Sequence, residues 1–325
     1  GIARLLLLLG ALLPGTGSAE VVVGSKKFTE SVILGELARQ LGAAAGVPVR
    51  HRASLGGTRV LWNALLAGDV DVYPEYTGTL LLEILPPDTD TDTDTDADAR
   101  PGGGWEALRA ALAARGVGAT PALGFENTYA LGMLAARAEA LGIRGIGDLG
   151  RHPGLALGFS NEFMDRPDGW PAVREAYRLP HTGVRGLDHD LAYRGLASGA
   201  LDATDLYSTD AEIPYYGLRV LDDPRGVFPE YQALYVYRLE VAEQAAALLA
   251  ALGSLAGRID AEEMAAMNAR AKLDGVPAAE VAAAFLEEEL GTAASGGAPA
   301  PTGMAARIAG RTGEHLVLVA VSLGA

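Results

Sequence analysis

Residues 21–41, VVVGSKKFTESVILGELARQL, join a run of valines to a stretch with apolar residues at helical spacing. The valine run ends at a glycine, and a short β-branched run bounded in this way predicts a buried strand. In residues 29–41 the apolar side chains recur every three or four positions, which predicts a helix with one buried face. A strand followed directly by a helix is the repeating unit of α/β folds.

The alternation of strands and helices continues downstream. We expect strands at residues 47–50 and 70–73, and between them a helix at 58–66 with Thr58 as its N-cap after two glycines. The same patterns predict five further elements: a helix at 105–115, a strand at 155–159, helices at 169–177 and 188–198, and a strand at 203–207. Together these elements predict an α/β protein whose sheets are flanked by helices.

A chain of 325 residues with 49% hydrophobic residues is long enough for about two lobes. We expect one lobe to contain residues 20–123 and 224–290, with a second lobe, residues 124–223, inserted between two crossings. A helix-rich return through the first lobe should start at Val236 and Tyr237. Two crossings are typical of proteins whose lobes close around a ligand about a hinge.

The two ends of the chain predict export and a link to a membrane component. Residues 1–19 contain one arginine, a short apolar run and small residues ending in alanine, which indicates a secretory signal peptide; an N-terminal membrane anchor is the alternative. Residues 291–310 are rich in small residues and proline and predict a linker. The apolar residues within 311–325 are either a strand or frayed helix, or the start of a permease's first transmembrane helix.

Acidic residues outnumber basic ones by 41 to 26, and several of them lie in the alternating Asp-Thr segment at residues 86–104. This segment lacks the glycine and the terminal glutamate of an EF-hand, so we expect a solvated insertion loop and not a calcium site. The formal net charge of −15 argues against a nucleic-acid partner. The absence of cysteine excludes disulfides, thiolate metal sites and a lipoprotein anchor cysteine.

Five short blocks stand out from an alanine-rich background. They are GSKKFTE at 24–30, LGGT at 55–58, GDVDVYPEYTGT at 68–79, ENTYAL at 126–131, and DLYSTD at 205–210 with FPEY at 228–231. In this order they resemble the substrate-binding proteins of quaternary-amine ABC transporters, which take up glycine betaine, proline betaine, choline or carnitine. The resemblance extends from about residue 21 to residue 290.

The resemblance implies a two-lobed periplasmic-binding-protein fold of the type II kind, in which each lobe is a mixed sheet flanked by helices and a hinge lies between the lobes. It also implies a periplasmic or other extracytoplasmic location, with membrane tethering if the permease is fused. The implied partners are a small quaternary amine, an ABC permease and its ATPase. The resemblance implies no cofactor and no metal.

A trimethylammonium group has no N–H to donate, so proteins bind it through cation–π contacts with aromatic faces. By resemblance, four tyrosines fall on the aromatic-cage positions of the family: Tyr76, Tyr129, Tyr207 and Tyr231. Five other tyrosines are expected to be structural: Tyr73, Tyr215, Tyr216, Tyr235 and Tyr237.

The other end of a betaine is a carboxylate, which needs a cation and hydrogen-bond donors. By resemblance, Lys26 and Thr79 match positions that meet this carboxylate, and Arg166 matches an arginine that reaches it across the cleft. Asn127 occupies a position where the family often has a polar or acidic group beside the cationic head. An asparagine offers a carbonyl dipole there but no charge.

Other functions fit the sequence less well. Neither a Gly-x-Ser-x-Gly nucleophile elbow nor a His-Glu-x-x-His zinc motif is present, so we expect a binding protein without catalytic residues. A receptor for an amino acid or another zwitterion, a choline receptor, and a sensing module of a fused transporter remain as alternatives. Because Lys26, Thr79 and Arg166 favour a ligand with a carboxylate, glycine betaine is the expected ligand.

Overall fold

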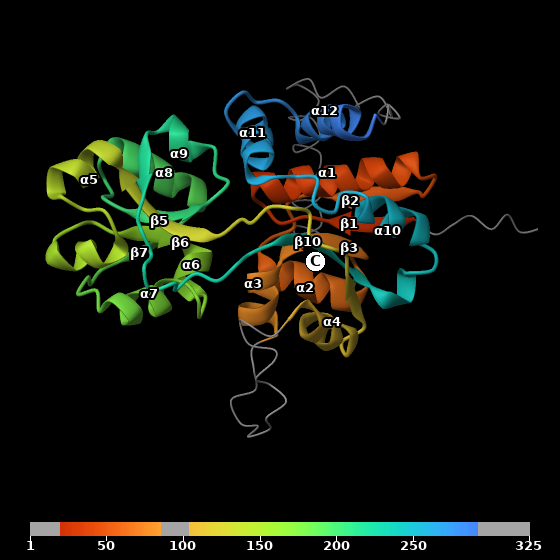
Figure 1. Cartoon of the computed structure of the whole chain (residues 1–325), viewed down its shortest axis with the longest axis horizontal. Coiled ribbons are helices and arrows are strands. Elements are labelled where there is room, and N and C mark those ends of the chain that lie inside the picture. The colour runs from red at the N-terminus through yellow and green to blue at the C-terminus, as the bar shows by residue number, and fades with distance from the viewer. Residues whose placement is uncertain (1–19, 86–103, 292–325) are drawn as a thin grey trace, which may run out of the picture.

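The computed structural model describes residues 20–85 and 104–291, which form two lobes side by side (Figure 1). The signal peptide and the possible permease segment expected from the sequence lie outside the described residues, as do the linker except for Gly291 and the Asp-Thr insertion except for Gly104. No helix in the described ranges is long and apolar enough to cross a membrane.

The first lobe is built on a five-stranded mixed sheet of order β2-β1-β3-β10-β4. Its strands, in chain order, are β1 (Val21–Gly24), β2 (Val49–Arg52), β3 (Val72–Tyr76), β4 (Val117–Ala119) and β10 (Ala233–Arg238). Strand β1 is parallel to β2 and β3, whereas β10 is antiparallel to β3 and β4. Strand β3 is buried at every residue, as the centre of a sheet covered on both faces should be.

Helices cover both faces of this sheet (Figure 1). On one side lie α1 (Thr29–Ala44), α10 (Ala246–Gly253), α11 (Ala261–Lys272) and α12 (Ala278–Leu290), and on the other α2 (Thr58–Ala67), α3 (Thr77–Thr79) with a π-helical turn (Leu80–Ile84), and α4 (Trp105–Ala113). Of the apolar residues that predict the buried face of α1, Ile33, Leu37 and Leu41 are buried and Val32 is half-buried.

The second lobe has a three-stranded antiparallel sheet of order β8-β5-β9 and a parallel pair, β6 and β7. The strands are β5 (Tyr129–Leu134), β6 (Gly158–Ser160), β7 (Arg185–Leu187), β8 (Thr204–Tyr207) and β9 (Leu218–Val220). A bridge between Leu157 and Ala203 joins the two groups. The helices are α5 (Ala135–Leu141), α6 (Asn161–Asp165), α7 (Trp170–Tyr177), α8 (His189–Ser198) and α9 (Glu212–Tyr215).

Two chain segments connect the lobes and pair with each other. Asn127 donates its backbone N–H to the carbonyl of Tyr231 at 3.0 Å, and Ala233 donates to Phe125 at 3.1 Å. Gly124, at the start of the first segment, has φ +122°, and a Cβ there would lie 2.7 Å from the carbonyl oxygen of Ile259. Only glycine therefore fits this crossing.

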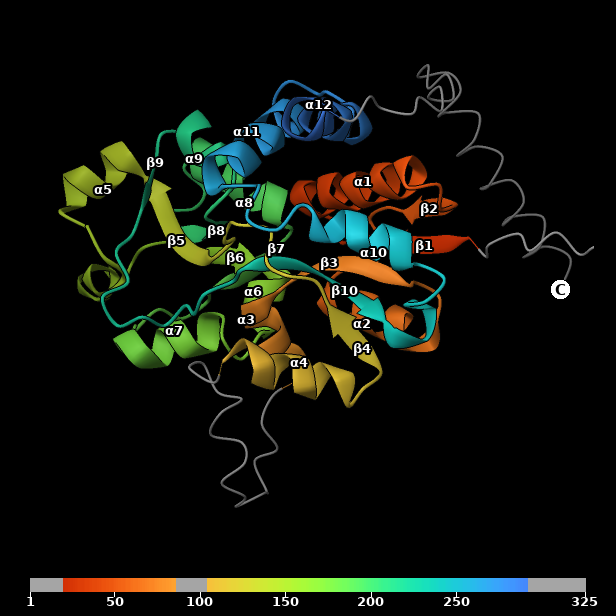
Figure 2. The same cartoon turned by 45° about the vertical axis from the view of Figure 1, so that its right-hand side comes forward.

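Ion pairs also join the lobes away from the connecting segments. Lys272, at the end of α11, lies 2.7 Å from Asp190 of α8 and 2.5 Å from Glu212 of α9. Figure 2 shows α11 extending from the first lobe toward α8 and α9. The two lobes are thus in direct contact on this side.

The predicted mixed α/β architecture is confirmed, but two local predictions are wrong. Val236 and Tyr237 do not begin a helical return, because they lie in β10 between β3 and β4. Thr58 is not an N-cap: Gly57 occupies that position, and the Thr58 hydroxyl turns to Lys26 and Glu162. The lobe boundaries at residues 123/124 and 223/224 stay a prediction.

Candidate functional site

A small cavity lies where the lobes meet. Its lining contains all eight residues selected from the sequence: Lys26, Tyr76, Thr79, Asn127, Tyr129, Arg166, Tyr207 and Tyr231. Phe28 and Glu162 also line it and were not predicted. The structure thus brings the eight residues together, and their roles toward a ligand stay a prediction.

Aromatic rings form much of the cavity wall. Tyr129 and Tyr207 are direct partners in the antiparallel pair β5–β8, and their ring centroids are 5.1 Å apart. Tyr231 meets the Tyr129 ring edge-on at 5.8 Å. Phe28 closes the wall between the lobes, at 5.5 Å from Tyr207 and 6.3 Å from Tyr76. The strand register therefore places two rings, and a phenylalanine from the turn before α1 links them to a third.

Tyr231 is held in place by a glycine and a carboxylate. A Cβ on Gly78 would lie 2.6 Å from the Tyr231 ring, so any side chain at residue 78 would displace the ring. The Tyr231 hydroxyl donates a hydrogen bond to Asp168. These contacts hold Tyr231, which is 1% exposed, between Gly78 of the first lobe and Asp168 of the second.

Lys26 starts a chain of polar contacts that crosses the cleft. Its ammonium group lies 2.6 Å from Glu75 Oε1 and donates to Thr58 Oγ1 at 3.0 Å. Thr58 in turn donates to Glu162 Oε1, in the second lobe, at 2.9 Å. An ammonium group has three N–H donors, so one remains for a further acceptor.

Arg166 is also largely engaged within the protein. Its Nε and Nη2 bind Asp168 at 2.9 and 2.5 Å, and its Nη1 lies 2.6 Å from Glu83 and 3.5 Å from Thr79. A guanidinium has five N–H donors, so these contacts leave one on Nη2. Arg166 does reach across between the lobes, but it is already paired with two carboxylates of the protein.

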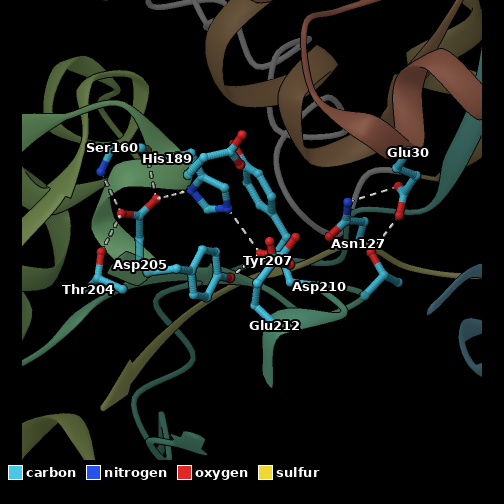
Figure 3. A network of polar contacts seen from close by, with 12 residues as sticks. Glu30, Asn127, Ser160, His189, Thr204, Asp205, Tyr207, Asp210 and Glu212 are labelled. Carbon is cyan, nitrogen blue, oxygen red and sulfur yellow. Dashed lines mark hydrogen bonds and ion pairs between the residues drawn. The ribbon is translucent and has the colours of Figure 1, made fainter. Parts of the chain in front are cut away.

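Glu30 lies behind the cavity and is 2% exposed. Its Oε1 accepts hydrogen bonds from Tyr76 at 2.5 Å and from Asn127 Nδ2 at 2.8 Å, and the Asn127 contact is visible in Figure 3. Its Oε2 accepts from Thr209 at 2.5 Å and from Asn268 at 3.1 Å. Burial raises the pKa of Glu30, and these four hydrogen bonds oppose the rise without cancelling it.

A second polar cluster, built on the buried Asp205 and the half-buried His189 and Asp210, lies against the Tyr207 ring (Figure 3). The His189 ring lies 4.4 Å from Tyr207, and its Nε2 is 3.0 Å from Asp210 Oδ2. On its other side, Nδ1 is 3.6 Å from Asp205. Burial alone would lower the pKa of His189, but the charge of Asp210 and contacts with both aspartates raise it to about 10. His189 is therefore a charged imidazolium at neutral pH.

This cluster predicts a pH-dependent stability. The folded-state pKa of His189 is above its ordinary value of about 6.5, so its stabilisation is complete below pH 6.5 and is lost as the pH rises through about 10. In urea titrations, His189→Gln should lower the free energy of unfolding by a few kcal/mol at pH 6 and by much less at pH 10. An equal deficit at both pH values would contradict this assignment.

Sequence reasoning missed Glu30, Phe28 and Glu162 for different reasons. Glu30 and Phe28 stand in the GSKKFTE block, but an acidic residue in the first turn of a helix is common, and Phe28 alone carries no binding signal. Glu162 lies in α6, and only the approach of the two lobes brings it to Thr58. In the described residues, no group of three or more His, Asp or Glu side chains could hold a metal ion.

Comparison with known proteins gives consistent matches. The family described as the substrate-binding domain of ABC-type glycine betaine transport systems matches residues 19–288. A glycine-betaine-binding protein of Pseudomonas aeruginosa is 32% identical over 292 residues, which are 86% of this chain and 91% of that protein. The ergothioneine transport permease/ergothioneine binding protein EgtU of Helicobacter pylori is 31% identical over 270 residues, 82% of this chain.

The chain spans only 47% of the length of EgtU. Among solved structures, the crystal structure of a glycine betaine/carnitine/choline ABC transporter is similar with a TM-score of 0.65 and 28% identity, over 82% of this chain and 98% of that one. The family match covers most of the sequence and both lobes. The chain therefore belongs to the family of substrate-binding domains of ABC-type glycine betaine transport systems.

Proposed function

We propose that this protein binds glycine betaine, or a quaternary amine close to it, outside the cytoplasm and delivers it to an ABC importer. The observation that carries the proposal is the cavity between the lobes, where five aromatic rings lie close to Lys26 and Arg166. A trimethylammonium group suits the rings and a carboxylate suits the cations. The family membership and the glycine-betaine-binding relative support the same ligand class.

The trimethylammonium group would lie against Tyr76, Tyr129, Tyr207 and Tyr231. Each cation–π contact contributes roughly 0.5–2 kcal/mol, so several contacts supply a good part of the ~8 kcal/mol that a micromolar site needs. The ligand carboxylate would accept from the remaining N–H donors of Lys26 and Arg166 and from the Thr79 hydroxyl. Because the rings come from both lobes, a bound ligand favours the closed arrangement.

A binding role, without catalysis, is part of this proposal.

Two other ligand classes are distinguished from glycine betaine by their chemistry. An amino acid carries an α-ammonium group, which needs hydrogen-bond acceptors that aromatic rings do not supply. Choline lacks a carboxylate and would leave the remaining donors of Lys26 and Arg166 without a partner.

A second candidate ligand is ergothioneine, which is also a trimethylammonium betaine. The observation that favours it is the 31% identity to EgtU, named as an ergothioneine binding protein. Its ring would require more room beyond the carboxylate than glycine betaine needs.

Calorimetric titration with four ligands tests the proposal. Glycine betaine should bind about tenfold more tightly than choline, since a buried donor left unpaired costs roughly 1–3 kcal/mol. Glycine, which lacks the methyl groups, serves as the control and should not bind measurably. Tighter binding of choline would refute the carboxylate assignment, and tighter binding of ergothioneine would make it the physiological ligand. Failure of all three quaternary amines would refute the function.

We further propose that a permease follows in the same polypeptide and tethers this domain to the membrane. Support comes from EgtU, whose name joins permease and binding protein and of which this chain spans 47%. Reading the gene beyond Ala325 tests this proposal. A stop codon directly after residue 325 would refute it.

A further inference from the structure

Glu30 is a buried carboxylate surrounded by neutral donors. Tyr76 comes from the first sheet, Asn127 from a connecting segment, Thr209 from the second lobe and Asn268 from α11, and all four donate to it. Among the described residues, no lysine, arginine or histidine forms an ion pair with Glu30. The other buried carboxylates at the cavity differ, because Glu75 pairs with Lys26 and Asp168 pairs with Arg166.

Two of the four donors, Tyr76 and Asn127, are also cavity residues. The side-chain nitrogen Nδ2 of Asn127 donates a hydrogen bond to Glu30, so the carbonyl oxygen Oδ1 of the same side chain takes no part in that contact. That oxygen is buried and has no hydrogen-bond partner. A buried acceptor without a hydrogen-bond partner costs free energy, so a positive charge or a donor in the cavity would stabilise Oδ1.

Tyr76 conveys the negative charge of Glu30 to the cavity in a different way, through its ring. Its hydroxyl donates to Glu30, and a phenol that donates to a carboxylate carries more electron density in its ring. A richer ring face attracts a cation more strongly. Both cavity residues therefore present to the ligand a negative potential whose source is Glu30.

We propose that Glu30, in its ionised form, is the counter-charge for the quaternary ammonium group and acts through Tyr76 and Asn127 as a positioning residue that selects cationic head groups. This inference rests on the proposed function, because it assumes a quaternary ammonium ligand. It accounts for the asparagine at residue 127: the negative charge that this position lacks is supplied one hydrogen bond farther back. The raised pKa of Glu30, caused by burial, agrees with a carboxylate that has no cation beside it in the unliganded protein.

The competing explanation is that Glu30 only ties the lobes together: it accepts from Thr209 of the second lobe, and the neighbouring Asn268 donates to the Thr209 carbonyl. A purely structural role would affect every ligand that needs the closed arrangement. A charge role would affect only ligands with a positive head. Two ligands of one shape separate these explanations: glycine betaine, and 3,3-dimethylbutanoate, in which carbon replaces the quaternary nitrogen.

The experiment compares wild type with Glu30→Gln in direct and displacement calorimetric titrations of both compounds. Glu30→Gln should weaken glycine betaine by at least about tenfold and change 3,3-dimethylbutanoate by less than about threefold, so that the selectivity between the two ligands falls. Equal losses for both ligands would overturn the proposal in favour of a structural role. An unchanged selectivity with unchanged affinities would overturn it outright.

Asn268→Leu is the matched variant, because it removes one hydrogen bond to Glu30 and one to the Thr209 carbonyl of the second lobe and leaves the carboxylate in place. It should keep the wild-type selectivity even if both affinities fall, and it provides the test of the structural role if Glu30→Gln does not fold. A loss of selectivity in Asn268→Leu equal to that expected for Glu30→Gln would overturn the charge role. If wild type binds no quaternary amine, the proposed function fails before Glu30 is in question.

Discussion

Replacing Tyr207 with alanine is expected to weaken glycine betaine binding by roughly 10- to 100-fold, the loss of one desolvated cation–π contact and of its apolar area. Tyr207 lies at the centre of the aromatic wall, 5.1 Å from Tyr129 and 5.5 Å from Phe28. Its removal also opens the wall toward the charged His189 behind it. Calorimetric titration of the purified domain measures the effect.

Two variants control this experiment. Tyr207→Phe keeps the ring and should retain most of the affinity, since the interaction depends on the π face and not on the hydroxyl. Tyr215→Ala removes a tyrosine that is 63% exposed and lies outside the cavity lining, and it should leave the dissociation constant unchanged. Wild-type affinity in Tyr207→Ala would mean that the ring does not contact the ligand.

Replacing Arg166 with methionine is expected to lower the free energy of unfolding by about 3–5 kcal/mol, because removing one partner of a buried ion pair leaves the other charge unpaired. Here two carboxylates, Asp168 and Glu83, lose the same cation, and Arg166 is 3% exposed. Urea titration at neutral pH measures the loss. Adding Glu83→Gln to this variant should recover part of it, because one uncompensated charge disappears.

The control for Arg166 is Arg137→Met. Arg137 pairs with Asp202 at 3.0 Å, but its side chain is 49% exposed, and exposed pairs contribute only about 0–1 kcal/mol. If Arg166→Met lowers the free energy of unfolding no more than Arg137→Met does, the ion pairs of Arg166 do not stabilise the fold.

The elements with strong local patterns were predictable. The valine run and the helical spacing at residues 21–41 correspond to β1 and α1. The strand expected at residues 203–207 is β8, Thr204–Tyr207. In each case the apolar period is contained in a few consecutive residues. Strand β10 was missed although Leu234–Tyr237 is rich in aromatic and β-branched residues, and its pairing with β3 and β4, more than 100 residues earlier, shows that this run is a strand and not the start of a helix.

The candidate site, like the fold, was predictable only in part. The motif blocks contain seven of the eight predicted residues, and Arg166 was selected by resemblance in residues 162–169. All eight line one cavity, where the two lobes meet. Their electrostatic state could not be derived from the blocks. Whether Arg166 and Lys26 are free or paired depends on Glu83, Asp168 and Glu75.

What the amino-acid sequence by itself determined is the α/β succession of elements and, through resemblance, eight of the ten residues that line the cavity, since both depend on short, contiguous patterns. Only the tertiary structure decided which charges are already neutralised and which remain. It brought Glu30 of α1 into contact with donors as distant as Asn268. Coulomb and hydrogen-bond energies depend on distances between groups, and sequence separation does not encode those distances.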